Sequence, residues 1–172
     1  MNVEQVTVPS SEFPEPAFQP LDARVVKLWR VRRSITSAVL LVAVTVAAIS
    51  ITWATEQWLS PIVGWTAFLV LSLVLTFWYP PRAYQGWGYR IDGKVLETRR
   101  GIWFRVHQLL PLPRLQHVDL HSGPLERSLG LASLLLHTAG TQQASIVIPG
   151  LDAREAVRLR DELIAIGGDD GV

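Results

Sequence analysis

Two long stretches without a charged residue constrain this chain more than any other feature of its sequence. The first covers residues 34–53 (SITSAVLLVAVTVAAISITW) and the second covers residues 62–79 (IVGWTAFLVLSLVLTFWY). As α-helices they would extend about 30 Å and about 27 Å, close to the thickness of the hydrocarbon core of a bilayer. Between residues 34 and 79 the only formal charge is Glu56. We therefore predict a membrane protein with a hairpin of two transmembrane helices.

Three other interpretations of the apolar stretches are weaker. A signal peptide is shorter and lies near the N-terminus, whereas here the first stretch begins at residue 34 and a second one follows. A buried hairpin of a soluble protein would need more chain around it than the remaining residues provide. An interfacial helix needs a polar face, which neither stretch has.

The charges that flank the two stretches predict their orientation. The loop between them carries only Glu56, and Arg82 and Arg90 follow the second stretch. A juxtamembrane basic cluster precedes the first stretch and consists of Arg24, Lys27, Arg30, Arg32 and Arg33. Because basic residues stay on the cytoplasmic side, both termini are expected in the cytoplasm and the protein in the cell (inner) membrane. The same cluster is suited to attract anionic lipid headgroups.

The segments around the hairpin differ in composition. Residues 1–20 contain four prolines and three glutamates but no basic residue, and they are predicted to be a disordered tail. Residues 21–33 are predicted to form a juxtamembrane amphipathic helix with Val25, Leu28 and Trp29 on one face. Pro80-Pro81 is expected to end the second span sharply, because proline cannot donate to a helix ladder.

From residue 86 onward, alternating apolar residues and turn signals indicate a mainly-β domain that ends near residue 168. Asp152 and Glu155 form a D-x-x-E capping box before a helix that carries Leu159 and Leu163 on its apolar face. The predicted fold is a strongly bent sheet or small barrel capped by this C-terminal α-helix. Its strands are expected at residues 89–92, 95–99, 102–109, 115–121, 131–138 and 144–148.

Three phrases of the β-rich part carry a family resemblance: YRIDGKVLETRRGIWFR, LPLPRLQHVDLHSGPLERSLGLASLLLHTAG and IPGLDAREAVRLRDEL. With them the sequence resembles the bacterial pleckstrin-homology-like (PH-like) domain of the YdbS-like membrane proteins. The upstream LDARVVKLWRVRR, the two apolar stretches and WYPPRAYQGWGYRI are similar to the same family. The resemblance implies a seven-stranded bent sheet capped by a helix, and it implies no established reaction. PH-like folds serve protein and lipid binding alike, so the fold alone does not choose between them.

A possible metal site lies on one predicted strand. His117, Asp119 and His121 share a face because side chains alternate along a strand. Two imidazoles and a carboxylate can bind a divalent metal ion, but no fourth ligand is evident. A solvated strand face, with Val118 and Leu120 toward the core, is the favoured interpretation, and no metal site is predicted.

A possible lipid-headgroup contact lies near the first two turns of the β domain. Arginine and lysine bind phosphate through charge-assisted hydrogen bonds. Glu97 and Asp92 dilute this patch, and a mixed solvated face is the usual explanation. Nonspecific attraction to the anionic inner leaflet is a further possibility. The residues of the patch are Lys94, Arg99, Arg100 and Arg105.

The sequence gives no support for catalysis. Ser122 and Ser133 lie near histidines, but the chain contains no nucleophile elbow, no P-loop and no GxGxxG. The absence of cysteine excludes thiol nucleophiles, and a net charge of +1 is no argument for a nucleic-acid partner. We predict no enzyme activity and no cofactor.

Three functions are compatible with a β domain held at the inner leaflet. The leading hypothesis is a membrane-anchored interaction module that binds a membrane-protein partner or its own copy, since confinement to the membrane strengthens weak contacts. The second is an anionic-lipid-sensing domain. The third is an accessory subunit of a transport or export system, because two spans without intramembrane ionisable residues are too few for a pathway.

Overall fold

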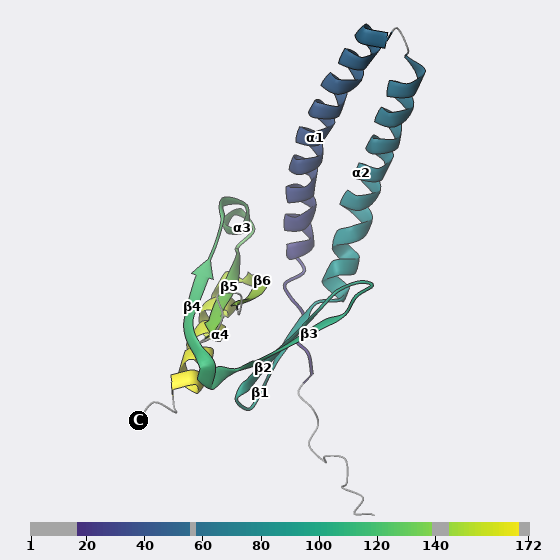
Figure 1. Cartoon of the computed structure of the whole chain (residues 1–172). Helices are drawn as coiled ribbons and strands as arrows, with labels where there is room; N and C mark the ends of the chain where they lie inside the picture. The colour runs from purple at the N-terminus through teal and green to yellow at the C-terminus, as the bar shows by residue number, and fades with distance from the viewer. Residues whose placement is uncertain (1–16, 56–57, 139–144, 169–172) are drawn as a thin grey trace, which may run out of the picture.

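The computed structural model describes residues 17–55, 58–138 and 145–168. Two long helices project side by side from a β domain (Figure 1). They are α1 (Val25–Thr55) and α2 (Leu59–Gln85), and both are long and apolar enough to cross a membrane. Apolar side chains such as Val39 and Val42 are about two-thirds exposed. An apolar surface of this kind needs lipid around it, which agrees with the predicted transmembrane hairpin.

A hydrogen bond joins the two helices inside the apolar region. The indole Nε1 of Trp65 donates to Thr45 Oγ1 over 3.0 Å. Trp65 therefore belongs to the helix packing rather than to an interfacial belt. Trp53 and Trp58, at the distal end of the hairpin, are 83 % and 62 % exposed, which suits residues placed at a membrane–water boundary.

The helix boundaries differ from those expected. The amphipathic segment and the first span form one continuous helix that begins at Val25. Helix α2 does not stop at Pro80-Pro81 but continues through both prolines to Gln85. Pro80 is buried together with Thr76 one turn earlier, so tertiary packing offsets the lost backbone hydrogen bonds. The extra turn brings the Tyr84 hydroxyl to donate to the carbonyl oxygen of Leu21 over 3.1 Å.

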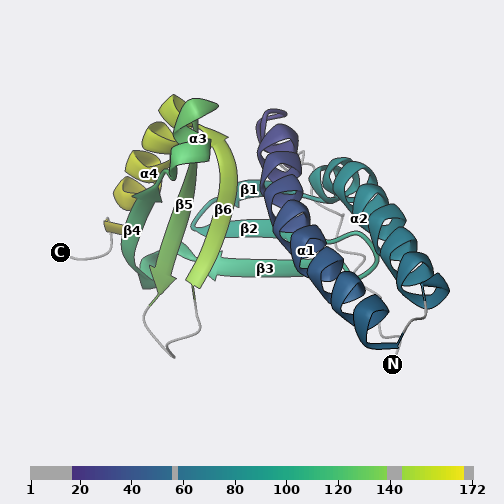
Figure 2. The same cartoon turned by 90° about the horizontal axis from the view of Figure 1, so that it is seen from above.

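The β domain consists of two three-stranded antiparallel sheets rather than a closed barrel. Seen from above, the strands of one sheet run crosswise to those of the other (Figure 2). The described residues contain six strands, one fewer than the resemblance implies. The first sheet has the order β1 (Gly88–Asp92), β2 (Val95–Arg100), β3 (Val106–Pro111), and the second has the order β4 (Leu115–His121), β5 (Leu131–Thr138), β6 (Ser145–Asp152).

The strand predictions agree with the structure to within a residue at each end, except around the second turn and at the last strand, which was expected to end at residue 148 but continues to Asp152. The strand expected over residues 102–109 begins only at Val106, since residues 101–105 form a loop. Gly101 has a φ of +128°, and a Cβ there would collide with the carbonyl group of Phe104. The loop therefore requires glycine at this position. The turn expected around Ala139-Gly140 lies outside the described residues.

The C-terminal helix α4 (Ala153–Gly168) packs on the second sheet and on a short 3-10 turn, η1 (Leu112–Arg114). Its Leu159 and Leu163 are buried, as its periodicity predicts. Asp152 caps the helix by accepting from the Arg154 N–H over 2.9 Å. A short helix, α3 (Pro124–Ser128), precedes β5.

The start of α1 is part of the β-domain core. Leu21, Val25 and Leu28 are buried in the same apolar cluster as the sheets. Gln19 forms a two-way backbone bridge with Tyr89 of β1, over 2.7 Å and 3.0 Å. The tail expected to reach residue 20 is therefore ordered from residue 17, whereas residues 1–16 lie outside the described part. The folded unit needs residues 17–28 as well as residues 86–168.

Candidate functional site

A basic pocket lies where the C-terminal end of α2 meets the β2–β3 loop. Its volume is about 600 Å³. Five of its lining residues are cationic or can become so: Arg82, Arg99, Arg100, Arg105 and His107. The rest of its lining is Gln85, two glycines and Ile102, so none of the described residues that line it is a carboxylate. The pocket can hold an anion between guanidinium groups.

Close backbone contact between the loop and the helix end positions this pocket. A Cβ at Gly86 would overlap the carbonyl oxygen of Gly101, so the loop lies directly on the residue that ends α2. The β2–β3 register then pairs Arg99 with His107 and Arg100 with Val106. Three of the pocket's arginines are therefore held beside the fourth, Arg82, on the helix.

An acidic side chain lies beside the pocket but is already paired. Burial alone would raise the pKa of Glu97, but hydrogen bonds with Arg90 (2.6 Å) and His107 (3.3 Å) hold it below its ordinary value. Glu97 therefore stays ionised next to Arg90. The guanidinium of Arg99 stacks on the Phe18 ring at 4.3 Å, which fixes it at the edge of the pocket.

The predicted headgroup patch is only partly brought together. Arg99, Arg100 and Arg105 line the pocket, but Lys94 does not. Lys94 precedes β2, whereas Arg99 and Arg100 end it, and about 17–20 Å of extended strand separate Lys94 from these two arginines. Lys94 lies at the other end of β2 because neighbouring turns of a meander lie at opposite ends of its strands, and its contact with a headgroup stays a prediction.

Arg24 of the juxtamembrane basic cluster is a structural residue. Its guanidinium pairs with Asp22 (2.7 Å) and Asp152 (2.6 Å) and donates to the carbonyl oxygen of Leu129 (3.0 Å). The hydrogen bonds from Arg24 lower the pKa values of Asp22 and Asp152. Arg24 therefore ties the start of α1 to the end of β6 and to the α3–β5 connection.

The remaining cluster residues lie on α1 nearer to the apolar region. Lys27 and Arg32 are exposed, and Arg30 is half-buried. The guanidinium of Arg33 stacks on Tyr79 of α2 at 4.1 Å. Arg32 and Arg33 stand at one end of a groove of about 480 Å³ between the two helices. These cations directly precede the apolar region of α1, and the orientation that they indicate stays a prediction.

The histidine prediction needs a correction. His117 and Asp119 do meet, at 2.7 Å, but the second histidine near Asp119 is His137 on β5, at 3.3 Å, and not His121. His137 is the cross-strand partner of His117. Among the described residues, no group of histidines and carboxylates is arranged to hold a metal ion. Leu120, expected in the core, is 38 % exposed because β4 is an edge strand.

The two serines considered for hydrolysis have structural partners. Ser122 donates to the carbonyl oxygen of Leu131 over 2.9 Å, and Ser133 donates to Glu126 over 2.8 Å. Both hydrogen bonds stabilise the short connection around α3. Their contacts explain the presence of both serines without a reaction.

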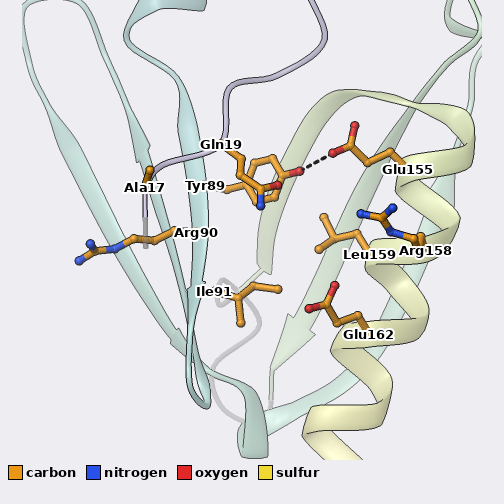
Figure 3. Close-up of a pocket in the computed structure, with 9 residues that line it drawn as sticks. All are labelled: Ala17, Gln19, Tyr89, Arg90, Ile91, Glu155, Arg158, Leu159 and Glu162. Carbon is orange, nitrogen blue, oxygen red and sulfur yellow. Dashed lines mark hydrogen bonds between the residues drawn. The ribbon is translucent and has the colours of Figure 1, made fainter. Parts of the chain in front are cut away.

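A second, smaller cleft separates β1 from α4 (Figure 3). Tyr89 and Ile91 face Glu155, Leu159 and Glu162 across a volume of about 140 Å³. The Tyr89 hydroxyl donates to Glu155 Oε1 over 3.1 Å, and burial together with this carboxylate raises the pKa of the tyrosine. The residues that line the cleft include acidic and basic side chains, and the Tyr89 hydroxyl is already hydrogen-bonded to Glu155. This hydrogen bond links the first sheet to α4.

Sequence reasoning missed several residues at the basic pocket and the histidine pair. Arg82 and His107 also line the pocket, and His137 lies beside Asp119 together with His117. Trp103 and Phe104, in the loop beside the pocket, are 82 % and 86 % exposed. The adjacent W-F between Arg100 and Arg105 was a signal in the sequence, since an alternating strand would have buried one of the two aromatic residues.

The membrane hairpin and the two crosswise sheets with a C-terminal helix define a membrane-anchored PH-like protein. The chain belongs to the bacterial PH domain family, whose sequence model matches residues 23–165. It is 34 % identical over 138 residues to the UPF0699 transmembrane protein YdbS of Bacillus subtilis (strain 168), covering 80 % of this chain and 84 % of that protein. No solved structure matches the chain. The resemblance to YdbS-like membrane proteins is confirmed.

Proposed function

We propose that this protein is a membrane-anchored PH-like module that binds anionic phospholipid headgroups of the inner leaflet in its basic pocket. The observation that carries the proposal is the group of four arginines and one histidine at the end of α2, with no carboxylate among the lining residues. The predictions of a protein partner and of an accessory role in transport have no comparable site among the described residues. They stay predictions.

The chemistry of the pocket suits a phosphodiester. Guanidinium groups present paired N–H donors that match two phosphate oxygens, and such charge-assisted hydrogen bonds are stronger than neutral ones. A volume of about 600 Å³ is in the range of small-molecule sites. A headgroup phosphate with its glycerol would fit this chemistry better than a long acidic peptide, which would need a groove.

The position of the pocket supports a lipid rather than a soluble anion. Arg82 lies on the last turns of α2, and its guanidinium stacks on Trp78 at 3.8 Å. Trp78 stands at the end of the apolar stretch, where an interfacial tryptophan is expected. With the basic flanks in the cytoplasm, as the positive-inside rule predicts, the pocket is at the level of the inner-leaflet headgroups. A non-catalytic role accords with membership in the bacterial PH domain family.

The proposal is tested with the full-length protein in detergent micelles, titrated separately with phosphatidylglycerol and phosphatidylcholine. Native mass spectrometry counts the bound lipids. We expect preferential binding of phosphatidylglycerol that the pair of substitutions Arg100→Glu and Arg105→Glu removes. Each lost charge-assisted contact is worth about 1.5–3 kcal/mol, or roughly 10- to 150-fold in affinity.

A matched control separates a site from general electrostatics. Arg154→Glu with Arg160→Glu changes the net charge equally on α4, which contributes no residue to the lining of the basic pocket. Equal losses in both double variants would show nonspecific attraction and contradict the proposal. A parallel titration with inorganic phosphate distinguishes a free anion from a lipid, because equal competition by phosphate would leave no role for the glycerol and acyl chains.

A further inference from the structure

The β2–β3 loop exposes two large aromatic side chains next to each other. Trp103 is 82 % exposed and Phe104 is 86 % exposed. Both belong to the five residues between β2 and β3; Arg100 precedes this loop and Arg105 is its last residue. A tip with apolar residues between cations suits a membrane interface, where aromatic rings lie among the headgroups and cations face the phosphates.

The tip of this loop lies beside the C-terminal part of α2, where the apolar stretch of that helix ends. The ring centroids of Trp103 and Trp78 are 6.5 Å apart. Phe104 shares a cavity of about 320 Å³ with Tyr79 of α2 and Trp29 of α1. Figure 1 shows the loop between β2 and β3 reaching the base of α2. The two aromatics therefore stand at the level of the aromatic residues that end the second span.

The loop is held at this level by backbone contact. Gly86 admits the carbonyl oxygen of Gly101 against the end of α2, where any side chain would collide. Gly101 in turn adopts a positive φ that lets the chain turn back sharply toward Phe104. The position of the tip relative to the helix is thus fixed by the fold.

We propose that the tip formed by Ile102, Trp103 and Phe104 inserts into the interfacial region of the inner leaflet, as a membrane contact in addition to the two transmembrane helices. The bilayer is the occupant because the tip continues the apolar surface of the transmembrane helices. This contact goes beyond headgroup binding and does not depend on it, since it needs no anionic lipid. It holds the domain so that the basic pocket faces the headgroups.

The absence of cysteine from the chain allows a direct test. A single cysteine is introduced as Trp103→Cys or as Phe104→Cys and labelled with an environment-sensitive fluorophore in the full-length protein. The protein is placed in bilayer nanodiscs of neutral phosphatidylcholine alone. A matched control is Leu109→Cys, a residue that is 67 % exposed on β3 but away from the loop.

We expect spin-labelled lipids to quench the tip labels severalfold more than the control label, and aqueous iodide to show the reverse order. If both tip labels are as accessible to iodide as the control and escape quenching by the lipids, the tip faces water and the inference is wrong. Either tip site suffices if the other variant does not fold. Because neutral lipid is used, this result is independent of the phosphatidylglycerol titration, and either proposal can fail alone.

Discussion

The contact between Val25 of α1 and Gly150 of β6 provides a quantitative test of how the β domain holds the first helix. Gly150 has a φ of +64°, and an added Cβ would overlap Val25 Cγ2 and lie 2.6 Å from Val25 Cβ. Val25 is fully buried and cannot move aside freely. Gly150→Ala therefore introduces left-handed strain of about 1–2 kcal/mol and overpacking of about 1–3 kcal/mol. We expect a total loss of roughly 2–5 kcal/mol.

Gly93→Ala is the matched control for this substitution. Gly93 has a similar φ of +56°, but nothing lies within 4 Å of an added Cβ. Only the strain of about 1–2 kcal/mol should appear there. Both free energies of unfolding are measured on the full-length protein in micelles by urea-dependent pulse proteolysis. If the two variants lose the same stability, Val25 is not seated on Gly150, and the docking of α1 described above is refuted.

Two further substitutions test the packing and the ion pairs of the domain. Leu163→Ala on α4 truncates a fully buried side chain and should destabilise the domain by about 2–5 kcal/mol in the same assay. A loss of stability below about 1 kcal/mol, as for a surface substitution, would contradict the packing of α4. Arg24→Gln should lower the pH 7 melting temperature. Arg24 holds the pKa values of Asp22 and Asp152 below 3.8, so its stabilisation is present above pH 3.8 and lost as the pH falls through the lowered values. The difference between wild type and variant should shrink on acidification, and a pH-independent difference would exclude these ion pairs as its cause.

Residue patterns in the sequence predicted the membrane hairpin, most strands and the C-terminal helix, because each depends on local periodicity. The uncharged stretches and the D-x-x-E box are signals of this kind. The prediction failed at Pro80-Pro81, where burial of Pro80 supports a helix that local propensity disfavours. It also failed at residues 102–105, where contact with the end of α2 replaces a strand by a loop.

The candidate site was predictable only in part because it combines residues distant in the sequence. Arg99, Arg100 and Arg105 are neighbours along the chain and were recognised as a basic group. Arg82 joins them only through the approach of Gly101 to Gly86, which no spacing rule reveals. Arg24 shows the opposite case: it resembles its basic neighbours in sequence, but two carboxylates engage it in the structure.

The attachments of the two helices to the β domain explain why a weak lipid contact could suffice for function. Helix α1 enters the domain core through Val25, and only Gly86 and Trp87 separate α2 from β1. No flexible linker lies between the described ends of the helices and the sheets, so insertion of the hairpin already fixes the orientation of the domain. Most of the rotational freedom that a soluble lipid-binding domain loses on binding is therefore lost beforehand. Under the proposed function, an arginine pocket held at the headgroups in this way would respond to the lipid composition of the leaflet even with a modest intrinsic affinity.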